Sequence, residues 1–159
     1  MTTPVLIVSI LFLPLLASWV IGGNDRVGFG GVLGIAFAFV FFAVGHYAQT
    51  GPMAEMLPEF VPFRRQVVLA TGALEVFIAA GILHPATRRL AGIAAIAVLV
   101  AFFPANIYAA INHVGMGGHA WGPVYLLIRA PLQMLLIVWA WLFLVRRPGP
   151  AVGPAPGHR

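Results

Sequence analysis

Two ionisable side chains of opposite sign stand inside apolar stretches of a chain that is only 8% charged. Glu75 lies within the run 67–83, and Arg129 lies within the run 124–145. An ionisable group at membrane depth costs at least ~2.5 to 3.5 kcal/mol on insertion scales, which favours a buried pair. The pair has two interpretations: a site where Arg129 donates to a carbonyl or oxyanion while Glu75 handles a proton, or a structural ion pair that fixes helix register.

Further polar side chains are expected at the same depth. At the rise of an α-helix, Glu75 lies roughly 12 Å and Arg129 roughly 8 Å below the start of its run, within reach of a long arginine stem. Asn106 and His113 are seven residues apart and therefore share a helix face. The candidate quinone- or anion-binding residues are His46, Glu75, Asn106, His113, Arg129 and Gln133.

Histidines and cysteines limit the other chemistries. His46 with His113 is the minimum for bis-imidazole haem, and His119 would make a three-histidine metal site. The spacing matches no recognised metal signature, so no metal site is predicted, and hydrogen-bonded histidines near the membrane interface are the alternative. The chain has no Cys, which excludes disulfides, thiolate ligands and covalent c-type haem attachment by the chain itself.

Composition determines the fold class. With 61% hydrophobic residues and a mean hydropathy of +0.98, the chain has too little polar surface for a soluble globule. Runs without any polar member exclude the alternation of a transmembrane β-barrel, so an all-α membrane bundle is predicted. Residues 1–147 are expected to form one domain, and 148–159 a disordered tail rich in Pro and Gly. The five expected transmembrane helices are 4–21, 27–47, 67–83, 90–111 and 124–145.

The distribution of arginines predicts the topology. The first run lacks the basic start of a signal peptide, so we expect it to be retained as a helix. One face then carries Arg64 and Arg65, and the other carries Arg26, Arg88, Arg89, Arg146, Arg147 and Arg159. Because cytoplasmic loops carry the excess of basic residues, the C-terminus is placed inside and the N-terminus outside. These arginines come as loop pairs and do not form a phosphate-binding patch, so no nucleic-acid partner is expected.

Two local patterns carry structural expectations. Gly30 and Gly34 form a small-xxx-small step, which lets two helices pack closely. The segment 50–65 interleaves apolar residues with Glu55, Glu59 and three Pro. It is predicted to lie in the membrane interface and to roof the outer end of the bundle.

Several motifs resemble one family. Leu57-Pro58, the Gly72–Glu75 step, 85–90 and 103–108, together with Arg129-Ala130-Pro131-Leu132-Gln133, resemble the DoxX-like family of small bacterial membrane proteins. The resemblance covers about residues 34–141. It implies a four-helix bundle, to which the run 4–21 adds a first helix. Members of that family are associated with a thiosulfate:quinone oxidoreductase subunit and with membrane redox complexes.

These observations lead to one functional expectation and two alternatives. The first is a subunit or accessory of a quinone-linked redox complex in the bacterial inner membrane, with lipids and other redox subunits as partners. Quinone is the cofactor considered, because the chain has no electron-carrier motif of its own. The alternatives are a non-catalytic structural subunit of a larger membrane complex and a small-molecule or lipid transporter. No residue is assigned a catalytic role.

Overall fold

Every regular element in the described part of the chain is a helix. The computed structural model describes residues 2–146, so the expected disordered tail and Arg147 and Arg159 lie outside it. The elements are α1 (Thr2–Gly22), α2 (Asn24–Ala48), α3 (Thr50–Glu55), α4 (Arg64–Leu83), α5 (Arg88–Ile111), η1 (His119–Tyr125), α6 (Leu126–Ala140) and η2 (Trp141–Arg146).

The predicted runs agree with the helices, with one difference at the last span. The first four runs correspond to α1, α2, α4 and α5, with ends that differ by three residues or fewer. The run 124–145 is instead composite: the 3-10 helix η1 leads into α6, which ends in the π-helix η2. Within η1, Gly122 has φ 71°, a left-handed conformation that interrupts regular helix geometry.

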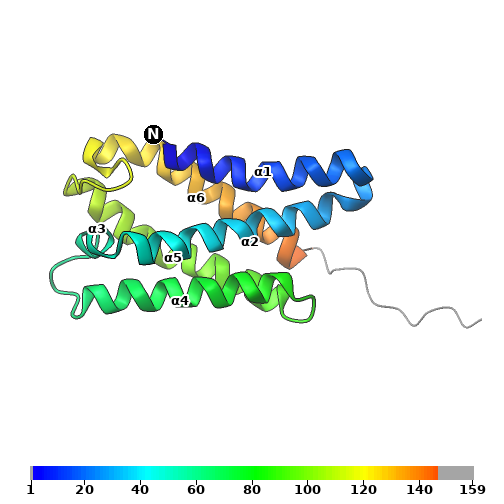
Figure 1. The fold of residues 1–159 in the computed structure, drawn as a ribbon. Helices are drawn as coiled ribbons and strands as arrows, with labels where there is room; N and C mark the ends of the chain where they lie inside the picture. The colour runs from blue at the N-terminus through cyan, green and yellow to red at the C-terminus, as the bar shows by residue number, and fades with distance from the viewer. Residues whose placement is uncertain (1, 147–159) are drawn as a thin grey trace, which may run out of the picture.

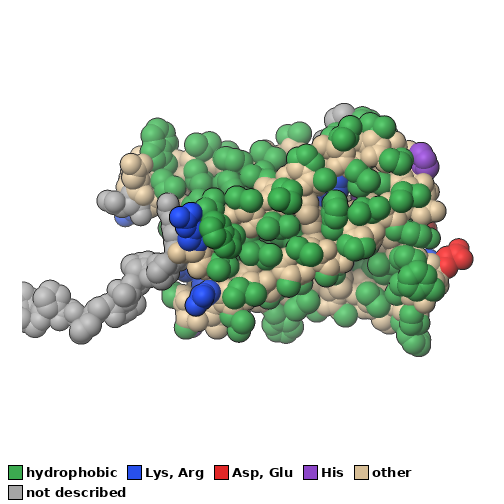
Figure 2. All heavy atoms as spheres, turned by 180° about the vertical axis from the view of Figure 1, so that it is seen from behind, with side chains coloured by type: hydrophobic (Ala, Val, Ile, Leu, Met, Phe, Trp, Pro, Cys, Tyr) green, Lys and Arg blue, Asp and Glu red, His purple; other side chains and the backbone are tan. Residues whose placement is uncertain are grey.

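Five segments of the described chain are long and apolar enough to cross a membrane. They are 3–22, 26–48, 64–83, 88–111 and 119–146. About 20 apolar residues at 1.5 Å each match a hydrocarbon core of roughly 30 Å. The outward-facing side chains are mostly hydrophobic, as Figure 2 shows for one flank.

The bundle has two chemically different ends. One end holds the beginning of α1, the segment around α3, and the connection between α5 and η1; we call it the N-terminal end (Figure 1). The opposite end holds the α1–α2 and α4–α5 turns and the end of η2 (Figure 1). In Figure 2, most of the visible basic side chains lie at this opposite end, with some basic atoms also showing in the other half, whereas the visible acidic and histidine side chains lie at the N-terminal end.

The half of the bundle away from the N-terminal end is filled with apolar side chains. Phe39, Ile82 and Leu136 are fully buried there, on three different helices. The Trp139 indole Nε1–H donates to the Gly31 carbonyl at 2.9 Å, which ties α6 to α2 inside the core. This packed layer forms the base on which the polar groups of the other half are held.

Close packing of small residues joins α1 to α2. A Cβ on Gly34 would stand 2.5 Å from the Leu11 carbonyl oxygen, and one on Gly30 would stand 2.6 Å from the Pro14 carbonyl oxygen. Only glycine permits backbones to approach this closely. The predicted role of the Gly30 and Gly34 step in helix packing is therefore confirmed.

Candidate functional site

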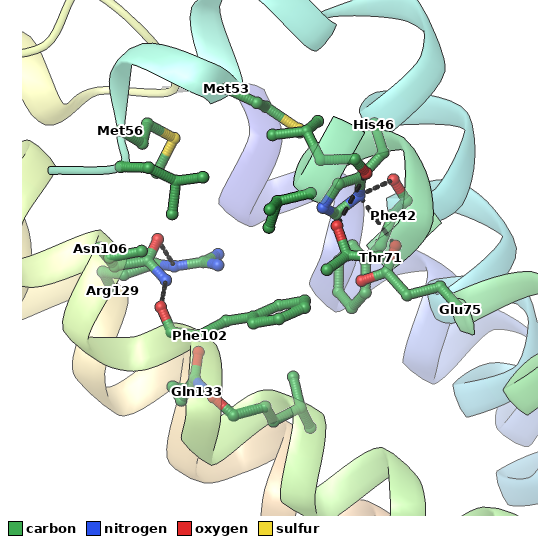
Figure 3. Close-up of a pocket in the computed structure, with 15 residues that line it drawn as sticks. Phe42, His46, Met53, Met56, Thr71, Glu75, Phe102, Asn106, Arg129 and Gln133 are labelled. Atoms are coloured by element: carbon green, nitrogen blue, oxygen red, sulfur yellow. Dashed lines mark hydrogen bonds and ion pairs between the residues drawn. The ribbon is translucent and has the colours of Figure 1, made fainter. Parts of the chain in front are cut away.

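A cavity of about 170 Å³ lies in the N-terminal half of the bundle. Four long helices contribute to its wall, and the segment after α2 covers it (Figure 3). Its lining residues are Phe42, His46, Met53, Met56, Leu57, Val67, Val68, Thr71, Glu75, Leu99, Phe102, Ala105, Asn106, Arg129 and Gln133.

One wall of the cavity carries a histidine and a carboxylate. His46 Nδ1 lies 2.9 Å from Glu75 Oε2 and 3.0 Å from the Phe42 carbonyl oxygen. In the tautomer that carries its hydrogen on Nδ1, this one proton faces both oxygens, and Oε2 has no other polar neighbour among the described residues. Glu75 is only 3% exposed. This wall is therefore a place where a proton can be held or passed.

The close approach of α2 and α4 makes this contact. A Cβ on Gly72 would lie 2.8 Å from the Cβ of His46, so only a glycine lets α4 come so near to α2. Gly72 precedes Glu75 by three residues and therefore shares its helix face. The backbone approach at Gly72 thus brings the carboxylate within reach of the imidazole.

The opposite wall carries a guanidinium held by an amide. Arg129 Nε donates to Asn106 Oδ1 at 3.0 Å, and Asn106 Nδ2 donates to the Phe102 carbonyl at 2.9 Å. The two Nη groups of Arg129 have no hydrogen-bond acceptor among the described residues. In Figure 3 the guanidinium points into the cavity, toward the imidazole of His46. Arg129 is therefore held in place through Nε, while its two Nη groups remain available to a ligand.

Gln133 lies one turn beyond Arg129 on α6 and closes the cavity from below. Its Nε2 donates to the Leu99 carbonyl of α5. Leu99 belongs to α5, so this contact ties α6 to α5 beside the cavity.

The roof comes from the segment after α2. Met53 of α3, Met56 and Leu57 cover the cavity, and the Leu57 carbonyl accepts a hydrogen bond of 3.4 Å from Arg64 Nη1. Phe102 forms the apolar surface on the other side, and Figure 3 shows its ring facing the methionines across the cavity. The space between the two polar walls therefore has Met53, Met56 and Leu57 above it and the Phe102 ring below it, with the Gln133 amide deeper on α6.

The structure brings five of the six candidate residues together. His46, Glu75, Asn106, Arg129 and Gln133 all line the cavity, whereas His113 does not. α5 ends at Ile111, so the seven-residue spacing from Asn106 no longer keeps a common face. His113 is exposed, has φ 51°, and places Nδ1 3.2 Å from the Ala120 carbonyl oxygen.

The charge pairing also differs from the sequence-based expectation. Glu75 is within ion-pair distance of His46, and Arg129 is not within ion-pair distance of Glu75. Both line the same cavity, so they share a site without direct contact. The haem alternative at His46 and His113 is not supported by this placement, since one ring lies at the cavity and the other packs against a loop carbonyl.

The aromatic residues of the cavity carry no distinguishing signal in the sequence. Phe42 and Phe102 belong to phenylalanine-rich helices, and nothing in their spacing separates them from phenylalanines that face outward. Met53 and Met56 could be placed near the site only because the segment 50–65 was expected to form a roof. His119 is 4% exposed, packs edge-on against Tyr125 and leaves Nε2 without a described partner; its burial carries no signal in the sequence.

Fold and cavity together define a multi-pass helical membrane protein with a polar pocket in one half of the bundle. The chain belongs to the family described as Domain of unknown function (DUF8561), whose model matches residues 35–144. That range covers the helices that line the cavity and leaves out α1. No curated protein and no solved structure matches the chain.

Proposed function

We propose that the cavity binds the head group of a membrane quinone, and that the protein acts as a subunit or accessory of a quinone-linked redox complex. The observation that carries this proposal is the open guanidinium of Arg129, which faces the His46–Glu75 wall across an apolar gap. The resemblance of the motifs in 57–133 to DoxX-like proteins, including a four-helix bundle extended by α1, supports the same assignment.

The two polar walls suit the shape of a quinone. A quinone ring is flat and apolar and carries carbonyl oxygens at opposite ends. The Arg129 Nη groups can donate to one oxygen, while Glu75 and His46 hold or supply a proton at the other. Met53 and Met56 above and Phe102 below would contact the ring faces, since sulfur and aromatic side chains pack well on π-systems.

A quinone bound here would carry electrons and protons between protein partners within the membrane. Electrons must come from or go to another subunit with its own carrier, because this chain has no motif for one. We place the protein in the bacterial inner membrane with the C-terminus inside, following the excess of arginines at the end opposite the cavity.

The open volume supports this proposal over a purely structural role. A scaffold that uses Glu75 and Arg129 only for register should close its polar seam with side chains. A cavity of about 170 Å³ is slightly larger than an engineered apolar cavity of roughly 150 Å³ that admits benzene. It has room for a ring, with substituents and tail directed outward.

The test is quinone binding to the purified protein in lipid nanodiscs, measured with a short-chain benzoquinone. Removing a charge-assisted donor costs ~1.5–3 kcal/mol, so we expect Arg129→Gln to weaken binding about 10-fold or more. Arg129→Lys keeps the charge but loses the planar fork, and should bind with intermediate affinity. Arg65→Gln is the matched control, because Arg65 is exposed at the same end and lines no part of the cavity.

The proposal fails if wild-type protein binds no quinone. It also fails if Arg129→Gln, with an unchanged melting temperature, binds as tightly as the control.

A further inference from the structure

We infer that the cavity exchanges protons and small polar solutes with the aqueous phase only at the N-terminal end of the bundle, with His46 as the proton carrier between Glu75 and that surface. This inference rests on the proposed function and adds a direction to it: a quinol oxidised here would release its protons on the N-terminal face.

The position of His46 supports the route. It lies two residues before the end of α2 at Ala48, and its side chain is 14% exposed while Glu75 is 4% exposed. In the tautomer that carries its hydrogen on Nε2, the bare Nδ1 accepts the proton of Glu75 across the 2.9 Å contact, so that the Oε2–H bond breaks and an Nδ1–H bond forms. The imidazole can then release a proton from its other nitrogen, since histidine has two ring nitrogens and serves both as base and as acid. No bond other than these N–H and O–H bonds forms or breaks.

The packing beneath Glu75 blocks a proton path toward the end of the bundle opposite the N-terminal end. Ile78, Ala79 and Ile82 follow Glu75 on α4 and are all buried, and the core residues of α2 and α6 at this level are apolar. The buried polar side chains among the described residues are Glu75, Asn106, His119 and Gln133, all in the N-terminal half. The Trp139 indole N–H in this core already donates to the Gly31 carbonyl, so the core side chains offer a proton no free acceptor.

Among the groups that face Glu75, only one can carry a proton toward the N-terminal end. α2 presents His46, α6 presents Arg129, α5 presents the neutral Asn106, and the roof presents methionines and Leu57. A cationic guanidinium repels an arriving proton, whereas the imidazole accepts one. His46 is therefore the titratable group of the cavity wall that can pass a proton onward.

Single-cysteine labelling in proteoliposomes tests the direction of access, because the chain has no native Cys. The reagent is a small anionic, membrane-impermeant methanethiosulfonate added to one side at a time. Glu59→Cys and Thr87→Cys are exposed references for the two faces. Thr71→Cys, on the cavity wall, should react from the same side as Glu59→Cys. Ala79→Cys, buried one turn below Glu75, should react from neither side.

The inference is wrong if Thr71→Cys is labelled from the side of the membrane on which Thr87→Cys reacts. It is also wrong if Thr71→Cys is labelled from neither side. Met53→Cys on the cavity roof repeats the test if Thr71→Cys does not fold.

A second measurement tests the carrier. The infrared carboxyl signal assigned by Glu75→Gln is followed after a pH step on the N-terminal face. A positioned acid–base group contributes about 100-fold or more to proton transfer, so His46→Phe should slow the response by about that factor. An unchanged rate in His46→Phe protein of normal stability contradicts the role of His46. These readouts need no quinone, so a failure to bind quinone defeats the proposed function separately from the sidedness of the cavity.

Discussion

The α1–α2 contact makes a quantitative prediction about Gly34→Ala. The new Cβ would stand 2.5 Å from the Leu11 carbonyl oxygen and 3.1 Å from the Leu11 Cα, where an ordinary contact begins at 3.4 Å. Both neighbours are backbone atoms, so no side chain can move aside, and α1 must retreat by about 0.9 Å. A gap of ~0.5–1 Å already loses a quarter to a half of the dispersion attraction along an interface.

The cost follows from packing and helix propensity together. Overpacking lowers the free energy of unfolding by ~1–3 kcal/mol. Replacing an interior helical glycine by alanine raises it by up to ~1 kcal/mol through the higher helix propensity of alanine. Gly45→Ala is the matched control on the same helix, because its Cβ meets only the flexible end of Met53 at 3.4 Å. The propensity gain cancels between the two variants. We therefore expect Gly34→Ala to have an unfolding free energy ~1–3 kcal/mol below that of Gly45→Ala.

Equilibrium unfolding in mixed detergent and dodecyl sulfate, followed by tryptophan fluorescence, measures this difference. Trp139 reports on α1 directly, since its ring centroid lies 4.8 Å from that of Phe12. No α1 residue lines the cavity, so the quinone affinity of Gly34→Ala should equal that of the wild-type protein. Equal unfolding free energies would mean that α1 does not pack on α2 at Gly34, and the position of α1 would have to be revised.

Two further predictions concern buried polar contacts. Trp139→Phe removes the indole donor to the Gly31 carbonyl, and we expect a loss of ~1–3 kcal/mol because a buried acceptor is left unpaired; exposed Trp121→Phe is the control, and equal melting temperatures would contradict the bond. A double-mutant cycle with His46→Ala and Glu75→Ala should give a coupling free energy of ~0.5–3 kcal/mol in thermal unfolding, because the two groups are 2.9 Å apart. Additive effects would show that the contact contributes nothing to stability.

The spans could be predicted from the sequence because hydropathy over about 20 residues depends only on composition and length. The exception is the last span, where Gly122 has a left-handed φ and Trp141 begins a π-helical turn. These departures depend on contacts with the rest of the fold. At Gly122, for example, a Cβ would meet the His113 ring at 2.4 Å.

The sequence predicted five of the residues that line the cavity, and it did not predict which of them contact each other. Depth along each helix follows from residue counting, which is why five candidate residues line one cavity. The partner of Glu75 depends instead on how α4 is rotated and how near it stands to α2. That distance is fixed at Gly72, where the backbone approaches His46, and a single sequence does not reveal which glycine has this role.

The incompletely paired groups of the cavity argue for a ligand on energetic grounds. Glu75 Oε2 is buried, and its one polar neighbour is His46 Nδ1 at 2.9 Å, which also faces the Phe42 carbonyl oxygen. Arg129 is anchored through Nε, while its Nη groups face open volume. A bundle held together by these residues would be at least as stable with apolar side chains in their place, because buried ion pairs rarely exceed their desolvation cost. A bound oxygen-bearing ring would give the guanidinium Nη groups an acceptor beside the His46–Glu75 pair, whereas the contact of Arg129 with Asn106 leaves these donors unused.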